Sequence, residues 1–165
     1  MIKFVLAFFL FTSTILLASE KKTELELHLG SYHSNKVYNN DNYGVGINYN
    51  YTKKMQFNCG IYNNSQRHES LYFGATYFPI EWKGFKVGAG ALLATGYRDY
   101  TMAITPDGKY YYWKDRKVLL NPICGLVLTY KINRFVSAKV LASTDKYISS
   151  NEPTTLLHFS LIFPF

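Results

Sequence analysis

The sequence predicts an all-β fold, a transmembrane barrel of eight antiparallel strands, and three observations indicate it. The chain ends on a segment from Leu157 to Phe165 in which large apolar residues alternate with mostly small or polar ones. Alternation with a period of two is typical of a strand with one apolar face. Seven earlier segments repeat this pattern. Aromatic residues, which form the interfacial girdles of membrane barrels, make up 18% of the chain.

The N-terminal segment is typical of a secretory signal peptide. Lys3 precedes a nearly continuous apolar stretch from Phe4 to Leu17, and Ala18 is a small residue suited to cleavage. We expect residues 1–18 to be removed and residues 19–165 to form one domain. No later segment has the length of a membrane-spanning helix, so the chain would cross a membrane as a closed barrel. This predicts the outer membrane of a Gram-negative bacterium.

Eight segments alternate apolar residues with small or polar ones and are predicted to be the strands. In chain order they are Thr23–Ser34, Tyr43–Tyr51, Met55–Tyr62, Ser70–Phe78, Gly84–Tyr97, Val118–Tyr130, Phe135–Ala142 and Thr154–Phe165. Outward positions of the first five include Leu25, Leu27, Val45, Ile47, Phe57, Cys59, Leu71, Phe73, Phe85 and Val87. In the first strand, strict alternation assigns Gly30 and Tyr32 to the same inward face as Glu26 and His28.

The connections between these strands alternate in length. Short turns are predicted at Thr52–Lys54, Ile80–Lys83 and Lys131–Arg134. Longer loops are predicted at Asn35–Asn42, Asn63–Glu69, Arg98–Lys117 and Ser143–Pro153. In outer-membrane barrels the short turns face the periplasm and the long loops face the outside.

Charge and composition restrict the partners. The formal net charge is +7, and the lysines and arginines lie mostly in turns and loops. We expect them to meet the phosphates of phospholipid head groups or lipopolysaccharide, and we expect no nucleic-acid partner. No His/Cys cluster has ligand spacing, so neither a metal nor another cofactor is expected. We expect a monomer.

Small residues dominate the inward face of the fourth and fifth strands. They are Ser70, Gly74, Thr76, Gly88, Gly90, Ala94 and Gly96. The interior of an eight-stranded barrel is normally filled by side chains. One interpretation is that these residues leave a slot for one slender ligand such as an acyl chain, with Gly74, Thr76, Gly88 and Gly90 as its lining. The other is that the glycines relieve bends in strongly coiled strands.

Over most of Tyr38–Tyr130, the order and spacing of several motifs resemble those of the lipid A palmitoyltransferase family. The motifs are Tyr38-Asn39, Gly44 and Gly46, the run from Ile61 to Ser65, Gly74, the Phe85 to Gly90 strand, Arg98-Asp99, and Val118 to Leu120 with Pro122. The resemblance implies an eight-stranded barrel that moves an acyl chain from a phospholipid donor to a lipid A (lipopolysaccharide) acceptor in the outer leaflet.

The resemblance also implies site residues at the extracellular rim. Ser65 matches the family's serine, and Asn64 stands where the family has an aspartate. The histidine is His33 or His28, and His33 is favoured because it lies at the outer end of its strand. A neutral imidazole there would take the proton of the attacking lipid hydroxyl. Ser65 would donate a hydrogen bond to the oxyanion, or act as a nucleophile if His33 activates it.

Two departures from the family pattern bear on activity. Asn64 cannot supply the charge of a carboxylate, and Asn and Ser are also ordinary turn residues. Thr76 replaces a pocket glycine, which predicts an acyl chain shorter than palmitate. A second hypothesis is therefore a non-enzymatic small barrel of the same descent, which binds a surface partner or modifies the envelope.

Overall fold

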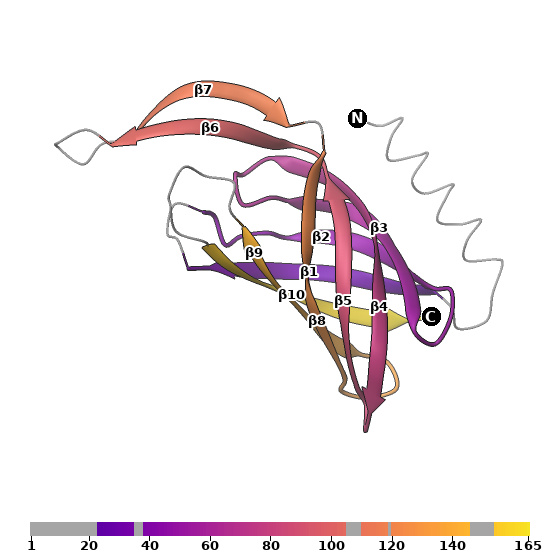
Figure 1. Cartoon of the computed structure of the whole chain (residues 1–165). Helices are drawn as coiled ribbons and strands as arrows, with labels where there is room; N and C mark the ends of the chain where they lie inside the picture. The colour runs from indigo at the N-terminus through magenta and orange to yellow at the C-terminus, as the bar shows by residue number, and fades with distance from the viewer. Residues whose placement is uncertain (1–22, 35–37, 105–109, 119, 146–153) are drawn as a thin grey trace, which may run out of the picture.

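The computed structural model describes residues 23–34, 38–104, 110–118, 120–145 and 154–165, and the proposed signal peptide lies outside them. Eight of its strands close a barrel, and two form a separate hairpin (Figure 1). The barrel strands are β1 (Thr23–His33), β2 (Gly44–Asn50), β3 (Met55–Asn63), β4 (Glu69–Trp82), β5 (Phe85–Ala94), β8 (Asn121–Lys131), β9 (Ser137–Asp145) and β10 (Thr154–Pro164). The hairpin strands are β6 (Tyr97–Ile104) and β7 (Tyr110–Val118). The described ranges contain no helix long and apolar enough to span a membrane.

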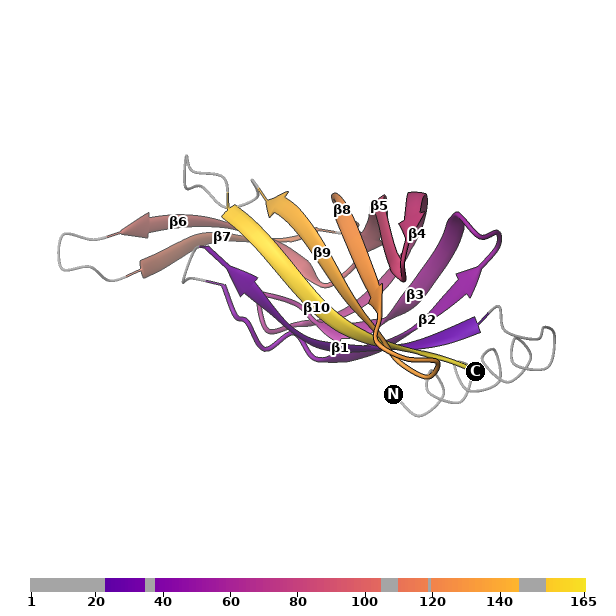
Figure 2. The ribbon, with the colours of Figure 1, turned by 90° about the horizontal axis from the view of Figure 1, so that it is seen from below.

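The barrel order is β1-β10-β9-β8-β5-β4-β3-β2, with every pair antiparallel. This confirms the predicted eight-stranded barrel, and closure by β1 and β10 leaves the barrel sheet without an edge. The prediction of a plain loop at Arg98–Lys117 is wrong, because β6 and β7 form there and pair with each other. Their hairpin extends beyond the barrel wall (Figures 1 and 2). Runs such as Tyr110–Trp113 favour strands, although they lack the alternation of a membrane-facing strand.

The predicted turn at Ile80–Lys83 is too long. Strand β4 continues to Trp82, after a register shift between Tyr77 and Ile80. The turn consists of Lys83 and Gly84, with φ of 45° and 87°. Positive φ at both central residues is what a tight type I′ hairpin turn requires.

A β-bulge divides β1 into two halves: even-numbered residues face the lumen before the bulge, and odd-numbered residues face it after the bulge. His28 pairs with Ser160 and Gly30 with Phe159, so Leu29 is an extra residue on this strand. Beyond the bulge the alternation is inverted. Tyr32 is 55% exposed, so its predicted inward orientation is wrong, whereas His33 is only 7% exposed.

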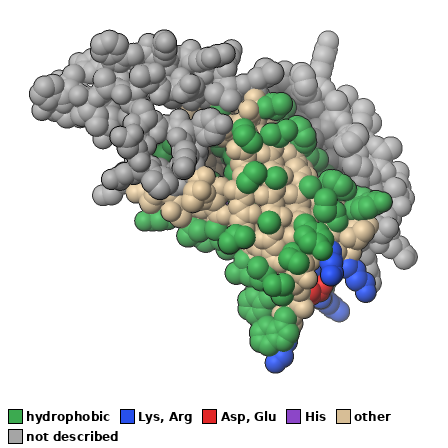
Figure 3. Space-filling model, in the orientation of Figure 1, with side chains coloured by type: hydrophobic (Ala, Val, Ile, Leu, Met, Phe, Trp, Pro, Cys, Tyr) green, Lys and Arg blue, Asp and Glu red, His purple; other side chains and the backbone are tan. Residues whose placement is uncertain are grey.

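Large apolar side chains cover the outside of the barrel. Exposed examples are Leu71, Phe73, Tyr77, Ile80, Trp82, Val87, Leu126, Leu128 and Phe135. Figure 3 shows hydrophobic side chains spread over the described wall, with Lys and Arg gathered toward its lower end. An exterior of this kind suits lipid, because water would penalise so large an apolar surface.

The lower lumen is filled by polar side chains. Glu26 and Lys139 are 2% and 8% exposed, and Lys139 Nζ donates to Glu26 Oε2 at 2.9 Å. Beside them, Gln56 Nε2 donates to Glu24 and Asn50, each at 3.0 Å. The chain therefore has a packed polar interior beneath its outer end, as expected for a barrel of this size.

Candidate functional site

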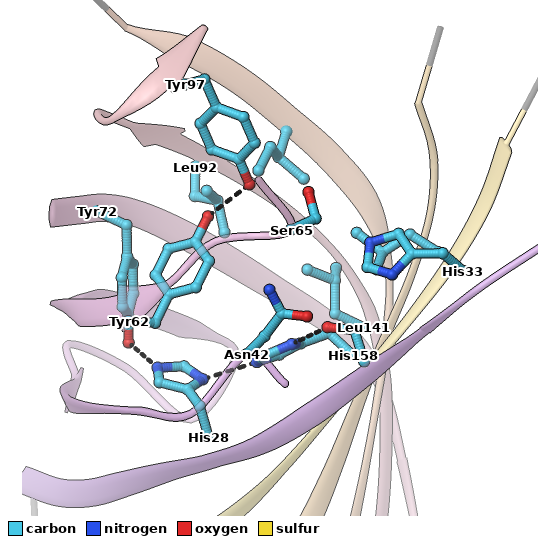
Figure 4. Close-up of a pocket in the computed structure, with 13 residues that line it drawn as sticks. His28, His33, Asn42, Tyr62, Ser65, Tyr72, Leu92, Tyr97, Leu141 and His158 are labelled. Atoms are coloured by element: carbon cyan, nitrogen blue, oxygen red, sulfur yellow. Dashed lines mark hydrogen bonds between the residues drawn. The ribbon is translucent and has the colours of Figure 1, made fainter. Parts of the chain in front are cut away.

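A small cavity that opens to solvent lies inside the long-loop end of the barrel (Figure 4). Polar and apolar side chains from seven barrel strands, from the hairpin strand β6 and from the adjoining loops surround it. They are His28, Ser31, His33, Asn42, Tyr62, Ser65, Tyr72, Leu92, Tyr97, Ile123, Leu141, Leu156 and His158. An apolar wall with a few convergent polar groups is the usual form of a small-molecule site.

His33 is the last residue of β1, and the bulge turns it into this cavity. Its backbone N–H donates to Asn40 Oδ1 at 3.1 Å, and its Nδ1 lies 2.9 Å from the same oxygen. Since that oxygen can only accept, Nδ1 carries the imidazole proton and Nε2 carries the lone pair. The ring stacks on Tyr38 with centroids 5.1 Å apart. These contacts fix both the orientation and the tautomer of His33.

Ser65 reaches the same cavity from the loop after β3. The loop between β1 and β2 holds it in place, because Asn39 N–H donates to the Ser65 carbonyl at 2.9 Å. Asn42 Nδ2 donates to the Asn63 carbonyl at 2.8 Å. The Oδ1 of Asn42 has no partner among the described residues, although this side chain is 2% exposed and lines the cavity. A buried acceptor of this kind is suited to a donor group on a ligand.

Asn64, the third predicted catalytic residue, is not among the residues that line the cavity. It is fully buried, and its Nδ2 donates to Ser70 Oγ at 2.9 Å and to the Gly96 carbonyl at 3.0 Å. Its Oδ1 accepts from the backbone N–H groups of Gln66 and His68. These bonds require an amide, because a carboxylate has no proton to donate to a carbonyl. Asn64 thus shapes the loop that carries Ser65.

The predicted acyl-pocket residues also lie outside this cavity. A Cβ on Gly74 would lie 2.4 Å from the Ala91 carbonyl oxygen, and one on Gly88 would lie 2.0 Å from that of Tyr77. Their missing side chains therefore allow close approach of neighbouring strands. Thr76 is buried and accepts from Asn58 at 3.3 Å, and a Cβ on Gly90 would meet Thr76 Oγ1 at 3.0 Å. The packing favours the second interpretation, in which the glycines accommodate coiled strands.

The wall of the cavity contains two histidines that touch each other. His28 Nδ1 lies 2.8 Å from His158 Nε2, and His28 Nε2 lies 2.8 Å from the Tyr72 hydroxyl (Figure 4). Gly46 makes this possible, because a Cβ there would lie 2.0 Å from the Tyr72 hydroxyl oxygen. The sequence predicted His28 only as an alternative to His33 and predicted no role for His158. The two histidines lie on the inward faces of the first and last strands. Because these strands must pair to close a barrel, the sequence did indicate that the two histidines could meet.

No model of a known protein family matches the chain, and no curated protein sequence matches it. Solved structures do share its fold. A de novo designed transmembrane β-barrel aligns with a TM-score of 0.57 and 10% identity, covering 89% of this chain and 98% of the design. The N-terminal β-barrel domain of Pseudomonas aeruginosa OprF aligns with a TM-score of 0.55 and 17% identity, covering 89% of this chain and all of that domain.

The closed fold, the apolar exterior and the polar lumen decide the class of protein. The chain is an outer-membrane β-barrel. Its short turns lie at one end and its cavity at the other, so the cavity opens at the end that faces outward in such barrels.

Proposed function

We propose that this outer-membrane barrel is an acyltransferase that moves an acyl chain from a phospholipid to lipid A. The observation that carries the proposal is that His33, at the end of β1, and Ser65, in the loop after β3, line one cavity at the outer end. The proposed transfer takes place in the outer leaflet, which lies at this end of the barrel. The apolar side chains Leu92, Leu141 and Leu156 in the same wall suit an acyl chain beside the reacting ester.

The two polar residues have complementary roles in ester exchange. His33 Nε2, which carries the lone pair, is suited to take the proton from an attacking hydroxyl of lipid A. The Ser65 hydroxyl is suited to donate to the oxyanion that develops on the ester carbonyl. Asn42 Oδ1 would accept from a second hydroxyl of the acceptor lipid, next to the attacking one, and so orient the lipid.

The test is mass spectrometry of lipid A from cells that express the chain, compared with the variants His33→Ala and Ser65→Ala. We expect the added mass of one acyl chain in the wild type and its loss in both variants. His68→Ala is the matched control, because this histidine lies outside the cavity and contributes its backbone N–H to Asn64. Unchanged lipid A in cells whose outer membrane contains the folded wild type would refute the proposal.

A second candidate function is non-enzymatic binding of a surface partner. The β6–β7 hairpin favours it, since this two-stranded sheet extends away from the barrel at the cavity end (Figures 1 and 2). Shortening the hairpin to a turn between Tyr97 and Val118 separates the two functions. Such a deletion would abolish partner binding and leave lipid A modification intact.

A further inference from the structure

Four side chains from three strands form a continuous hydrogen-bonded chain along the wall of the cavity. Ser31 Oγ lies 2.7 Å from Nδ1 of His158. The other nitrogen of that ring contacts His28, and His28 contacts the hydroxyl of Tyr72, each at 2.8 Å. All four residues line the cavity. A hydroxyl, an imidazole and a second group that orients the imidazole is the arrangement that activates a nucleophile.

The proton positions in this chain are mutually consistent. If Ser31 donates to His158 Nδ1, then His158 carries its own proton on Nε2 and donates it to His28 Nδ1. His28 then carries its proton on Nε2 and donates to the Tyr72 oxygen. Both rings are neutral in this arrangement, and every nitrogen is satisfied. In this arrangement the lone pair of His158 points at the Ser31 hydroxyl, as general-base catalysis requires.

A negative charge lies behind the two histidines. Glu26 Oε1 is 3.9 Å from His28 Nδ1, and this carboxylate also pairs with Lys139. When His158 takes a proton, the positive charge that forms can be shared with His28 and stabilised by Glu26. In a site screened from water such an interaction is stronger than in solution. Glu26 thus acts as a positioning residue, since it lies in the lumen behind the cavity wall.

The bulge in β1 is what exposes Ser31 to the cavity. Strict alternation from Leu25 and Leu27 would place Ser31 on the lipid face, and the extra residue Leu29 reverses this. Of the two serines in the cavity, Ser31 is hydrogen-bonded to an imidazole in the described structure and Ser65 is not. The hydrogen bonds therefore indicate Ser31 as the nucleophile and leave Ser65 as the oxyanion donor.

We propose that Ser31 is the nucleophile of the acyl transfer and carries the acyl chain as a covalent intermediate, an inference that rests on the proposed function. Ser31 Oγ attacks the carbonyl carbon of the phospholipid ester, and its proton passes to His158 Nδ1. The tetrahedral intermediate breaks its bond to the glycerol oxygen, which takes that proton and leaves as a lysophospholipid. The product is an ester between Ser31 and the acyl chain.

The second half of the reaction returns the enzyme to its starting state. A hydroxyl of lipid A attacks the carbonyl of the acyl-Ser31 ester, and its proton passes to His33 Nε2. The bond to Ser31 Oγ then breaks, and the proton that His33 received passes to Ser31 Oγ, so that all the imidazoles are neutral again. Each half-reaction exchanges one ester for another, so no oxidant, metal or cofactor takes part.

The experiment labels the full chain in isolated outer membranes with an alkyl fluorophosphonate, which reacts with activated serines. Mass spectrometry of the digested protein should find the phosphonyl group on Ser31. Labelling should be lost in Ser31→Ala and should slow roughly 10²–10⁴-fold in His158→Gln, the usual contribution of a general base. Ser143→Ala is the matched control, because its hydroxyl donates to the Cys124 carbonyl and not to an imidazole. Heat-dependent gel migration verifies that each variant is folded.

Each outcome decides the inference. Label on Ser65, or no label on folded wild type, would overturn it. Lipid A is analysed from the same cells: acyl addition that persists in Ser31→Ala overturns the inference and leaves the proposed function standing. Label on Ser31 with unchanged lipid A supports an activated serine and refutes lipid A as the acceptor.

Discussion

Removing one member of the Glu26–Lys139 pair should destabilise the barrel more than removing both. At 2.9 Å and an effective dielectric constant of about 20, the Coulomb attraction is about 6 kcal/mol before desolvation. Lys139→Met leaves the Glu26 carboxylate, 2% exposed, without its main partner. Breaking a buried pair in this way costs about 3–5 kcal/mol. His28 at 3.9 Å offers partial compensation, so we expect the lower end of that range.

The double variant Glu26→Leu/Lys139→Met should recover most of this loss, because neither charge remains to be desolvated. Urea unfolding of the refolded barrel in lipid vesicles gives the free energies, and the four proteins form a double-mutant cycle. Lys131→Met is the control, an exposed lysine for which we expect a change within about 0.5 kcal/mol. Single variants within 1 kcal/mol of wild type, or a double variant equal to the sum of the singles, would refute the reasoning.

Two further substitutions test the glycines and the loop. Gly88→Ala puts a methyl group 2.0 Å from the Tyr77 carbonyl oxygen and should lower the free energy of unfolding by about 3 kcal/mol. Gly90→Ala should lower it by less than about 1 kcal/mol, because the atoms that its methyl group would meet belong to side chains, which can move. A folded Gly88→Ala barrel that transfers a different acyl chain would instead indicate a slot. Asn64→Asp should lower the free energy of unfolding by about 1–3 kcal/mol, because a carboxylate cannot donate to the Gly96 carbonyl. Increased acyl transfer by this variant, measured on lipid A, would contradict a structural role for Asn64.

The barrel itself was predictable because a lipid-facing strand imposes a strict rule on sequence. Residues along such a strand face lipid and the lumen in turn, so the inward burial of Ser160 and Ile162 follows from alternation alone. The β6–β7 hairpin was missed because it pairs outside the barrel, where neither face must be uniformly apolar. Its strands carry only a propensity signal, and propensity is a weak guide without burial.

The candidate site was predictable in part. Motif spacing drew attention to His33 and Ser65, and the structure brings both to one cavity. The same reasoning could not find Ser31, because a bulge adds one residue without a distinctive sequence mark. The contact between His28 and His158 joins the first and last strands. Its presence depends on the register at which the barrel closes, which a single sequence does not encode locally.

The bulge at Leu29 also determines which side chains in the outer half of β1 face the lumen. Below it, the position of each residue is set by the pleat that begins at Thr23; above it, the parity is reversed. Deleting Leu29 alone would remove the bulge and keep Ser31 and His33 on the lumen side, because Gly30 would then follow His28 directly in a regular alternation. Deleting Leu29 and Gly30 together would reverse the parity, which turns Ser31 and His33 toward lipid and Tyr32 into the lumen. The number of residues between His28 and Ser31 thus decides whether the barrel has an outward-opening site or is an inert barrel of the same fold.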